Sequence, residues 1–228
     1  MDPYISVIIP AHNEEKYIVE TLDSLKKQEY PDFETIVVTN GCTDQTEDLI
    51  KEQSSLIHLS LPVANVSRAR NHGASKAKGS LLLFLDADTR LEKDALRKVA
   101  TSFKNGVVVG TTKALADEKK LRYFLAMKLK NFYTKTKLYK GSSGVLICQR
   151  NIFDQVNGYD ADLHVKEHRK LIEKMCKHGS YTCVNTYATT SMRRFKEWGL
   201  VRVTLFWVKQ WVYDKVGDIR KSEYERVR

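Results

Sequence analysis

The first residues in this chain that could do chemistry are two carboxylates at the end of an apolar run. Asp86 and Asp88 follow the five large apolar residues of Leu81–Leu85, which predict a strand buried on both faces, as in a parallel sheet. Ligands of open α/β sheets bind beyond the carboxyl ends of the strands, and proteins hold Mg²⁺ with one or two carboxylates plus substrate phosphates. The pair therefore predicts a divalent-cation site. The alternative is that Asp88 and Thr89 cap a helix over residues 91–100.

Length and composition restrict the class of protein. The chain has 228 residues, 42% hydrophobic and 29% charged, which is typical of a globular protein with one large domain or two small ones. The net charge of +10 favours an anionic partner, whether a nucleotide, a nucleic acid or an anionic lipid surface.

Targeting and redox signals are weak. The four cysteines form no C-x-x-C pair, so neither a zinc site nor a disulfide framework is expected. The first residues lead straight into a strand and no apolar run reaches 18 residues, so we expect neither a signal peptide nor a membrane span. A cytoplasmic location is the expectation, with a peripheral position on the cytoplasmic face of the membrane as an extension of it.

Alternating strands and helices must position the acidic pair. Strands are expected over residues 5–9, 34–39, 56–61 and 81–85, with helices between them that carry Ile18, Leu22 and Leu25, Leu49 and Ile50, and residues 68–78. Such alternation gives parallel pairing with right-handed crossovers. The first hundred residues therefore predict a doubly wound, mainly parallel α/β sheet.

The pattern changes after residue 100. The sequence predicts strands over 106–112, 145–147 and 181–186, helices over 119–140 and 167–178, a loop at 141–144 and a turn at 157–160. Residues 198–213 are mostly apolar and a charged tail follows. We predict one domain over 1–195, with an amphipathic helix and tail over 196–228 packed on the domain or on a membrane surface.

Several of these segments together resemble the family 2 glycosyltransferases of the GT-A fold. The resemblance covers roughly residues 4–195 and rests on the order and spacing of its parts, because each part alone is weak. The matching segments are Val7–Glu15, Val37–Thr46, Ser67–Gly73, Asp86-Ala87-Asp88, Gly141–Gly144 and Asn157–Asp160.

The resemblance implies that a sugar moves, with inversion, from a UDP- or GDP-sugar to an acceptor hydroxyl or a polyprenyl phosphate. Mg²⁺ or Mn²⁺ would assist, because a cation and fixed cationic side chains stabilise the charge that gathers on the leaving diphosphate. Asp88 would hold the metal and Asp86 would assist it. The implied partners are the nucleotide sugar and a saccharide or lipid-linked acceptor.

The resemblance also implies a donor site and a sugar loop. Donor contacts are expected from Pro10, Ala11, His12, Glu14, Asn40, Arg70, Asp86, Ala87, Arg193 and Arg194, and contacts to the sugar or acceptor from Ser143 and Gly144. Asn40 stands where the family often has an aspartate that pairs with the base. Since an amide both donates and accepts hydrogen bonds, the preferred base stays open.

Each of these positions has a structural alternative. His12 would simply pack the turn after the first strand, and Arg70 would be a solvated helix charge. Glu14 suits the first turn of a helix in either case. Arg193 and Arg194 would form a solvated basic turn, although arginine forks match phosphate oxygens well.

The general base is less clear from the sequence. In the family, the second residue of an E-D pair removes the proton from the acceptor hydroxyl, and here that pair is Glu167-His168. Both residue types act as general bases, and an imidazole is better suited to neutral pH. Because the family base is usually the second residue of the pair, position slightly favours His168 as the base. Glu167 is nearly as good a candidate, because it is a carboxylate. The alternative is a degenerate, non-catalytic protein that binds a nucleotide sugar or another anion.

Two amphipathic stretches bear on the acceptor. Residues 119–140 are basic, and residues 198–213 carry three tryptophans, which suits a membrane interface. Alternatively, both helices cover the α/β core. A nucleotidyltransferase would need a glycine-rich loop after the first strand, and the chain lacks one there. No nucleic-acid recognition motif is present, so no nucleic-acid partner is expected.

Overall fold

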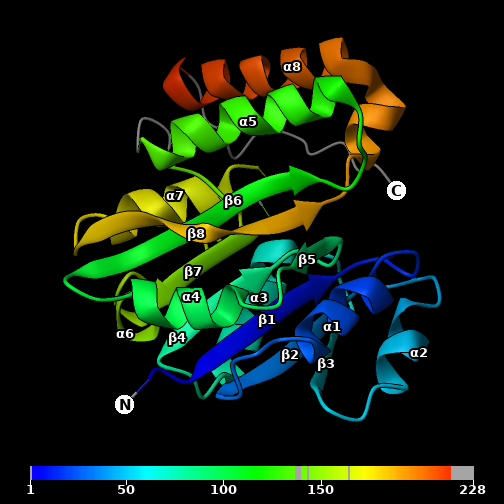
Figure 1. Ribbon diagram of the computed structural model, residues 1–228. Helices are drawn as coiled ribbons and strands as arrows, with labels where there is room; N and C mark the ends of the chain where they lie inside the picture. The colour runs from blue at the N-terminus through cyan, green and yellow to red at the C-terminus, as the bar shows by residue number, and fades with distance from the viewer. Residues whose placement is uncertain (1, 137–139, 143, 164, 217–228) are drawn as a thin grey trace.

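The computed structural model describes residues 2–136, 140–142, 144–163 and 165–216, and Figure 1 shows a single mixed sheet with helices on both faces. The strand order is β3-β2-β1-β4-β7-β6-β8-β5. The strands are β1 Ile5–Ala11, β2 Phe33–Asn40, β3 Ile57–Leu61, β4 Leu81–Leu85, β5 Thr89–Leu91, β6 Val107–Ala116, β7 Val145–Gln149 and β8 Ser180–Thr190. The described helices are α1 Ile18–Lys26, α2 Thr46–Lys51, α3 Val66–Lys76, α4 Ala95–Ser102, α5 Leu121–Lys135, α6 Arg150–Gln155, α7 Glu167–Met175 and α8 Arg193–Val216.

The first four long strands form the predicted parallel unit. β1 pairs in parallel with β2 on one side and β4 on the other, so that Ile8 lies beside both Ile36 and Phe84. β4 alternates between two cores: Leu83 packs with α1, α2 and α4, and Phe84 packs with α3, α6 and α7. Because both faces of β4 are covered, every one of its residues is buried, which explains its unbroken apolar sequence.

The second half of the sheet is less parallel than predicted. β7 runs antiparallel to both β4 and β6, and β5 runs antiparallel to β8, whereas β6 and β8 are parallel. The expected helix over 91–100 is also wrong at its start, since Thr89 belongs to β5 and α4 begins at Ala95. The interpretation of Asp88 and Thr89 as a helix cap is therefore not supported.

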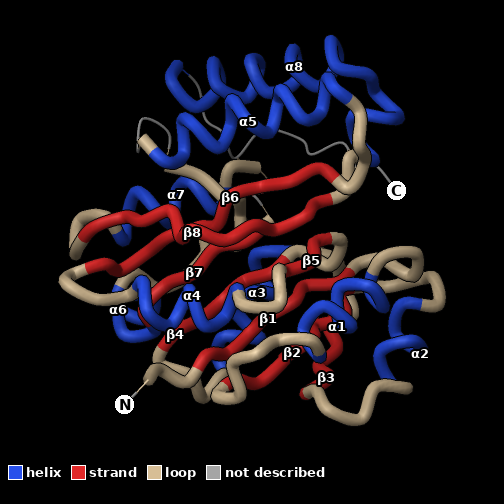
Figure 2. Tube along the Cα trace, viewed as in Figure 1, coloured by secondary structure: helices blue, strands red, loops and turns tan. Residues whose placement is uncertain are grey.

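Two helices lie beyond β6 and β8, where Figures 1 and 2 draw α5 and α8 as neighbours. α8 is broken at Gly199, whose φ of 72° and ψ of 165° are not helical. The predicted domain boundary at residue 195 falls inside its first segment, and most of the predicted tail, residues 217–228, is outside the described residues. Within the described part of the chain, no helix combines the length and hydrophobicity needed to cross a membrane.

Candidate active site

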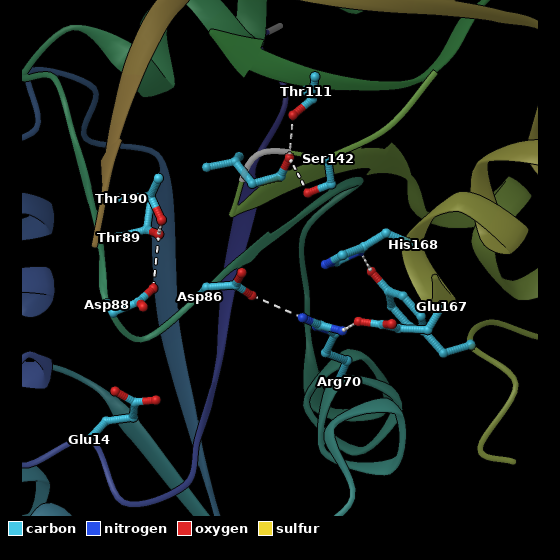
Figure 3. Close-up of polar contacts among 12 residues, drawn as sticks. Glu14, Arg70, Asp86, Asp88, Thr89, Thr111, Ser142, Glu167, His168 and Thr190 are labelled. Atoms are coloured by element: carbon cyan, nitrogen blue, oxygen red, sulfur yellow. Dashed lines mark hydrogen bonds and ion pairs between the residues drawn. The ribbon is translucent and has the colours of Figure 1, made fainter. Parts of the chain in front are cut away.

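The acidic pair lies in a short loop at the carboxyl end of β4 (Figure 3). The backbone N–H of Asp86 donates to the carbonyl of Gly144 at 2.8 Å, and the N–H of Thr89 donates to the carbonyl of Asp86 at 3.0 Å. Gly144 has a φ of +81°, and a Cβ there would lie 2.6 Å from Oγ1 of Thr89. Only glycine fits this close approach of the loop before β7 to the first residue of β5. Ser143, predicted beside it, lies outside the described residues.

Arg70 joins the acidic pair to the acceptor side of the predicted site. Its Nη2 contacts Oδ1 of Asp86 at 2.9 Å, and its Nη1 contacts Oε1 of Glu167 at 2.9 Å. The side chain of Arg70 is only 4% exposed, so the alternative of a solvated helix charge is wrong. One guanidinium from α3 therefore holds carboxylates from the end of β4 and the start of α7.

The surroundings of Arg70 keep it charged. Its guanidinium lies 5.3 Å from the ring centroid of Tyr159, a favourable cation–π position. Burial alone would lower the pKa of Arg70, but Tyr159, Asp86 and Glu167 outweigh burial and raise it. Tyr159 was not predicted as a site residue, although the sequence placed it in a turn of the resemblance.

Arg193 makes a second cluster on the other side of the acidic pair. Its two terminal nitrogens each contact one oxygen of Glu14 at 2.6 Å, and Nη2 also lies 3.2 Å from Oδ2 of Asp88. The guanidinium lies 5.2 Å from the ring centroid of Tyr17. The first residue of α8 is thereby fixed against the ends of β1 and β4, which the basic-turn alternative did not anticipate.

Asp88 is a buried carboxyl group with both cationic and anionic neighbours. Burial, reinforced by Asp86 and Glu14 and opposed by Arg193, raises the pKa of Asp88 to about 7. A cation close to such a carboxyl group stabilises its ionised form and lowers its pKa. Among the residues described, no three His, Cys, Asp or Glu side chains form a metal-binding group. The acidic pair fits a Mg²⁺ or Mn²⁺ ion that takes its remaining ligands from diphosphate oxygens and water, as such ions usually do.

The imidazole of His168 is enclosed in a way that favours its neutral form. Its Nδ1 lies 2.9 Å from the hydroxyl of Tyr159, and its Nε2 is buried without a hydrogen-bond partner among the described residues. Burial, together with the charge of Arg70, lowers the pKa of His168 well below its ordinary value. Protonation of this imidazole is therefore disfavoured in the folded protein.

Other predicted donor residues lie at the ends of β1 and β2. Pro10 and Ala11 are the last two residues of β1 and are buried. His12 follows them and is partly buried. Asn40 is buried at the end of β2, where its Oδ1 accepts the backbone N–H of Asn65 at 2.8 Å. This bond secures the start of α3.

Ala87 and Arg194 differ from the other predicted donor residues. Ala87 is buried, and its carbonyl oxygen accepts a hydrogen bond of 2.8 Å from the hydroxyl of Thr21. Its side chain and its carbonyl are therefore both engaged within the protein. The guanidinium of Arg194 lies 5.2 Å from the ring of Trp198 and 5.7 Å from that of Phe206. It thus packs on α8, while Arg193 takes the place beside the acidic pair.

Sequence comparison identifies the family. The model of glycosyl transferase family 2 matches residues 6–158, more than half of the chain. The chain belongs to this family. Similar proteins include glycosyltransferase GlyA of Streptococcus pneumoniae, 32% identical over 131 residues that make up 54% of this chain and 19% of GlyA. Another is the poly(ribitol-phosphate) beta-N-acetylglucosaminyltransferase TarS of Staphylococcus aureus, 35% identical over 102 residues, or 42% of this chain and 18% of TarS. The matched part is therefore about a fifth of either relative.

Solved structures show the same GT-A fold. TarS residues 1–349 in complex with UDP-GlcNAc match with a TM-score of 0.64 and 22% identity, over 83% of this chain and 58% of that one. Mannosyltransferase PcManGT of Pyrobaculum calidifontis, in complex with GDP-Man and Mn²⁺, matches with a TM-score of 0.70 and 19% identity, over 92% and 65%. At these identities the likeness establishes the fold of this family 2 chain.

Proposed function

We propose that this chain is an inverting, metal-assisted glycosyltransferase that uses a nucleoside-diphosphate sugar. The observation that carries the proposal is the bridge made by Arg70 between Asp86 and Glu167, at 2.9 Å to each. A single displacement needs the base and the leaving-group site on opposite sides of the sugar's reacting carbon. A rigid guanidinium fork keeps the two carboxylates at a set separation, which is the preorganisation that such a step requires.

Glu167 is the base in this proposal. Its side chain is 15% exposed and its Oε1 pairs with Arg70, so Oε2 is the oxygen that we expect to accept the proton of the acceptor hydroxyl. His168 instead supports Tyr159, which lies against Arg70. The predicted preference for His168 as the base is thus replaced by a preference for Glu167.

The donor would bind along the ends of β1, β2 and β4. Asp88, with Asp86, would hold Mg²⁺ or Mn²⁺, which when bound neutralises the charge that develops on the leaving diphosphate. Arg193 would exchange its contact with Glu14 for one with phosphate oxygens, since both are anions that its fork can bind. The complexes of TarS with UDP-GlcNAc and PcManGT with GDP-Man and Mn²⁺ support a UDP- or GDP-sugar and a divalent metal.

The acceptor is proposed to be a saccharide or a lipid-linked molecule such as a polyprenyl phosphate. TarS is named for transfer to poly(ribitol-phosphate), which supports an acceptor that is part of a polymer. A lipid-linked acceptor would place the protein at the membrane surface.

The experiment is calorimetric titration of UDP, GDP and their sugars, with and without Mn²⁺, followed by turnover measured as nucleotide release with candidate acceptors. We expect Mn²⁺-dependent binding of one nucleotide. Glu167→Gln should keep that binding and lose about 10²- to 10⁴-fold in turnover, the range for a general base. His168→Gln is the matched control and should lose far less.

A second function has one observation in its favour. The family's usual aspartate is replaced by His168, whose imidazole is enclosed, and this favours a non-catalytic nucleotide-sugar-binding protein. Mn²⁺-dependent donor binding with no turnover above that of Glu167→Gln would support it. The absence of nucleotide binding by folded protein would contradict both functions.

A further inference from the structure

α5 and α8 expose more apolar side chain to solvent than any other part of the described chain. Eight large hydrophobic residues on these two helices are each more than half exposed. They are Leu121, Phe124, Leu125, Leu129, Phe132, Val201, Leu205 and Val208, and we call them the α5–α8 face. Exposed apolar surface concentrated in this way marks an interaction site.

On α5 the exposed residues form one continuous stripe. They recur at spacings of one, three and four, so they share one side of the helix. The other side packs against the protein: Tyr123 and Met127 are buried, and Asn131 exchanges two hydrogen bonds with the backbone of Ala114 in β6, at 2.7 and 2.8 Å. α5 is thus apolar on both sides, and its outer stripe has no partner among the residues described.

α8 repeats this arrangement after its break at Gly199. Val201, Leu205 and Val208 are 73%, 63% and 52% exposed and lie on one side of the helix. Val203 and Gln210 on the other side are 1% and 2% exposed. Both helices lie at the same end of the molecule in Figure 1, and Phe195 of α8 packs beside Tyr123 of α5 with ring centroids 5.9 Å apart.

The charges around this face identify its partner. Residues 121–135 and 200–213 contain no aspartate or glutamate but six lysines and arginines. Five of these six are exposed: Arg122, Lys128, Lys135, Arg202 and Lys209. Apart from Glu197 and Asp214 near the two ends of α8, the charged residues of these two helices are cations. Apolar stripes accompanied mainly by cations match an anionic bilayer surface, where the stripe enters the acyl boundary and the cations meet the headgroups. We infer that the α5–α8 face docks this protein onto an anionic lipid membrane.

The docked face would be connected to the active site at two points. α8 begins at Arg193, which contacts Glu14 and Asp88. Farther along, the carbonyl of Gln210 accepts a hydrogen bond of 2.8 Å from Nζ of Lys166, the residue before Glu167. Docking would therefore bring the acceptor side of the site close to the lipid surface. This last step rests on the proposed function, whereas docking itself does not.

The test is co-sedimentation of the whole chain with phosphatidylcholine vesicles, with and without phosphatidylglycerol. The three tryptophans are residues 198, 207 and 211, so a blue shift of tryptophan emission reports on α8 directly. We expect binding and a blue shift with the anionic vesicles, and weaker binding at high salt. The double variant Leu125→Asp/Leu129→Asp should bind at least about tenfold less, because two charges replace apolar side chains at the boundary.

Val63→Asp is the matched control, since Val63 is 67% exposed but lies in the loop between β3 and α3; it should bind as the unmodified protein does. Equal vesicle binding by the double variant would overturn the inference. So would a stable dimer in lipid-free solution that the double variant converts to monomers, which would show that a second copy covers the face. Mn²⁺-dependent nucleotide binding, measured without lipid, tests the proposed function separately.

Discussion

Two arginines, Arg70 and Arg193, flank the acidic pair, and each holds two carboxylates in a different way. Arg70 reaches the site from the middle of α3, is 4% exposed, and lies against Tyr159. Arg193 is the first residue of α8, is 22% exposed, and lies against Tyr17. Arg70 is part of the buried core, whereas Arg193 borders the site from α8, the last helix of the described chain.

The difference in burial indicates that Arg70 and Arg193 have separate roles. A charge as enclosed as that of Arg70 cannot leave its partners without a large loss of free energy, because no water can replace them. Arg193 is 22% exposed against 4% for Arg70, although its partner Glu14 is only 12% exposed. Phosphate oxygens that enter the site can therefore reach the Arg193 fork and replace that carboxylate. We therefore expect Arg70 to maintain the architecture of the site and Arg193 to respond to the ligand.

Removing Arg70 should have the largest effect. We expect Arg70→Gln to lower the free energy of unfolding by about 3 kcal/mol, the low end of the range for breaking a buried pair, because Asp86 is 39% exposed and can be hydrated. Urea denaturation followed by circular dichroism measures the change.

The control for Arg70 is Arg90→Gln, since Arg90 pairs with Glu20 on the surface, at 40% and 63% exposure. Its cost should stay within about 1 kcal/mol. Similar costs for the two variants would show that Arg70 is not a buried structural charge.

Removing Arg193 should act on the ligand instead. We expect Arg193→Gln to weaken nucleoside-diphosphate binding by about 10- to 100-fold, the loss of one or two charged hydrogen bonds. Its free energy of unfolding should fall by less than that of Arg70→Gln, because Arg193 is the more exposed of the two arginines. Titration calorimetry measures the affinity. Arg194→Gln, next along α8, should bind as the unmodified protein does, and an equal loss would reassign the contact to Arg194.

The smallest effect concerns His168, which packs behind the Arg70 cluster. Burial and Arg70 lower the pKa of His168 below 6.5, so below that pH the unfolded chain binds a proton that the folded one does not. Stability should therefore fall as the pH drops below about 6.5, by at most about 1.4 kcal/mol per pH unit from this group.

The comparison of urea midpoints at about pH 7.5 and 5.5 tests this. His168→Gln should reduce the difference between the two midpoints. His178→Gln, at an exposed position after α7, should leave it unchanged. An undiminished pH dependence in His168→Gln would mean that the histidine is protonated without cost in the folded protein.

The sequence by itself determined the parallel half of the sheet and the position of the acidic pair. The apolar run of β4 and its abrupt end at Asp86 are local features, and both backbone periodicity and burial can be inferred locally. The order of the matching segments was likewise sufficient to indicate the family, which the comparisons confirmed.

Only the tertiary structure decided which charges meet. Arg70 and Glu167 are separated by 97 residues, and Arg193 and Glu14 by 179, and no local pattern specifies such partners. The same holds for the antiparallel direction of β7, which depends on its neighbours rather than on its own residues. The enclosure of His168 behind Tyr159 is also a packing result, and it reversed the preference between two adjacent residues. Periodicity predicted that α5 has an apolar stripe, but only packing showed that the stripe faces outward.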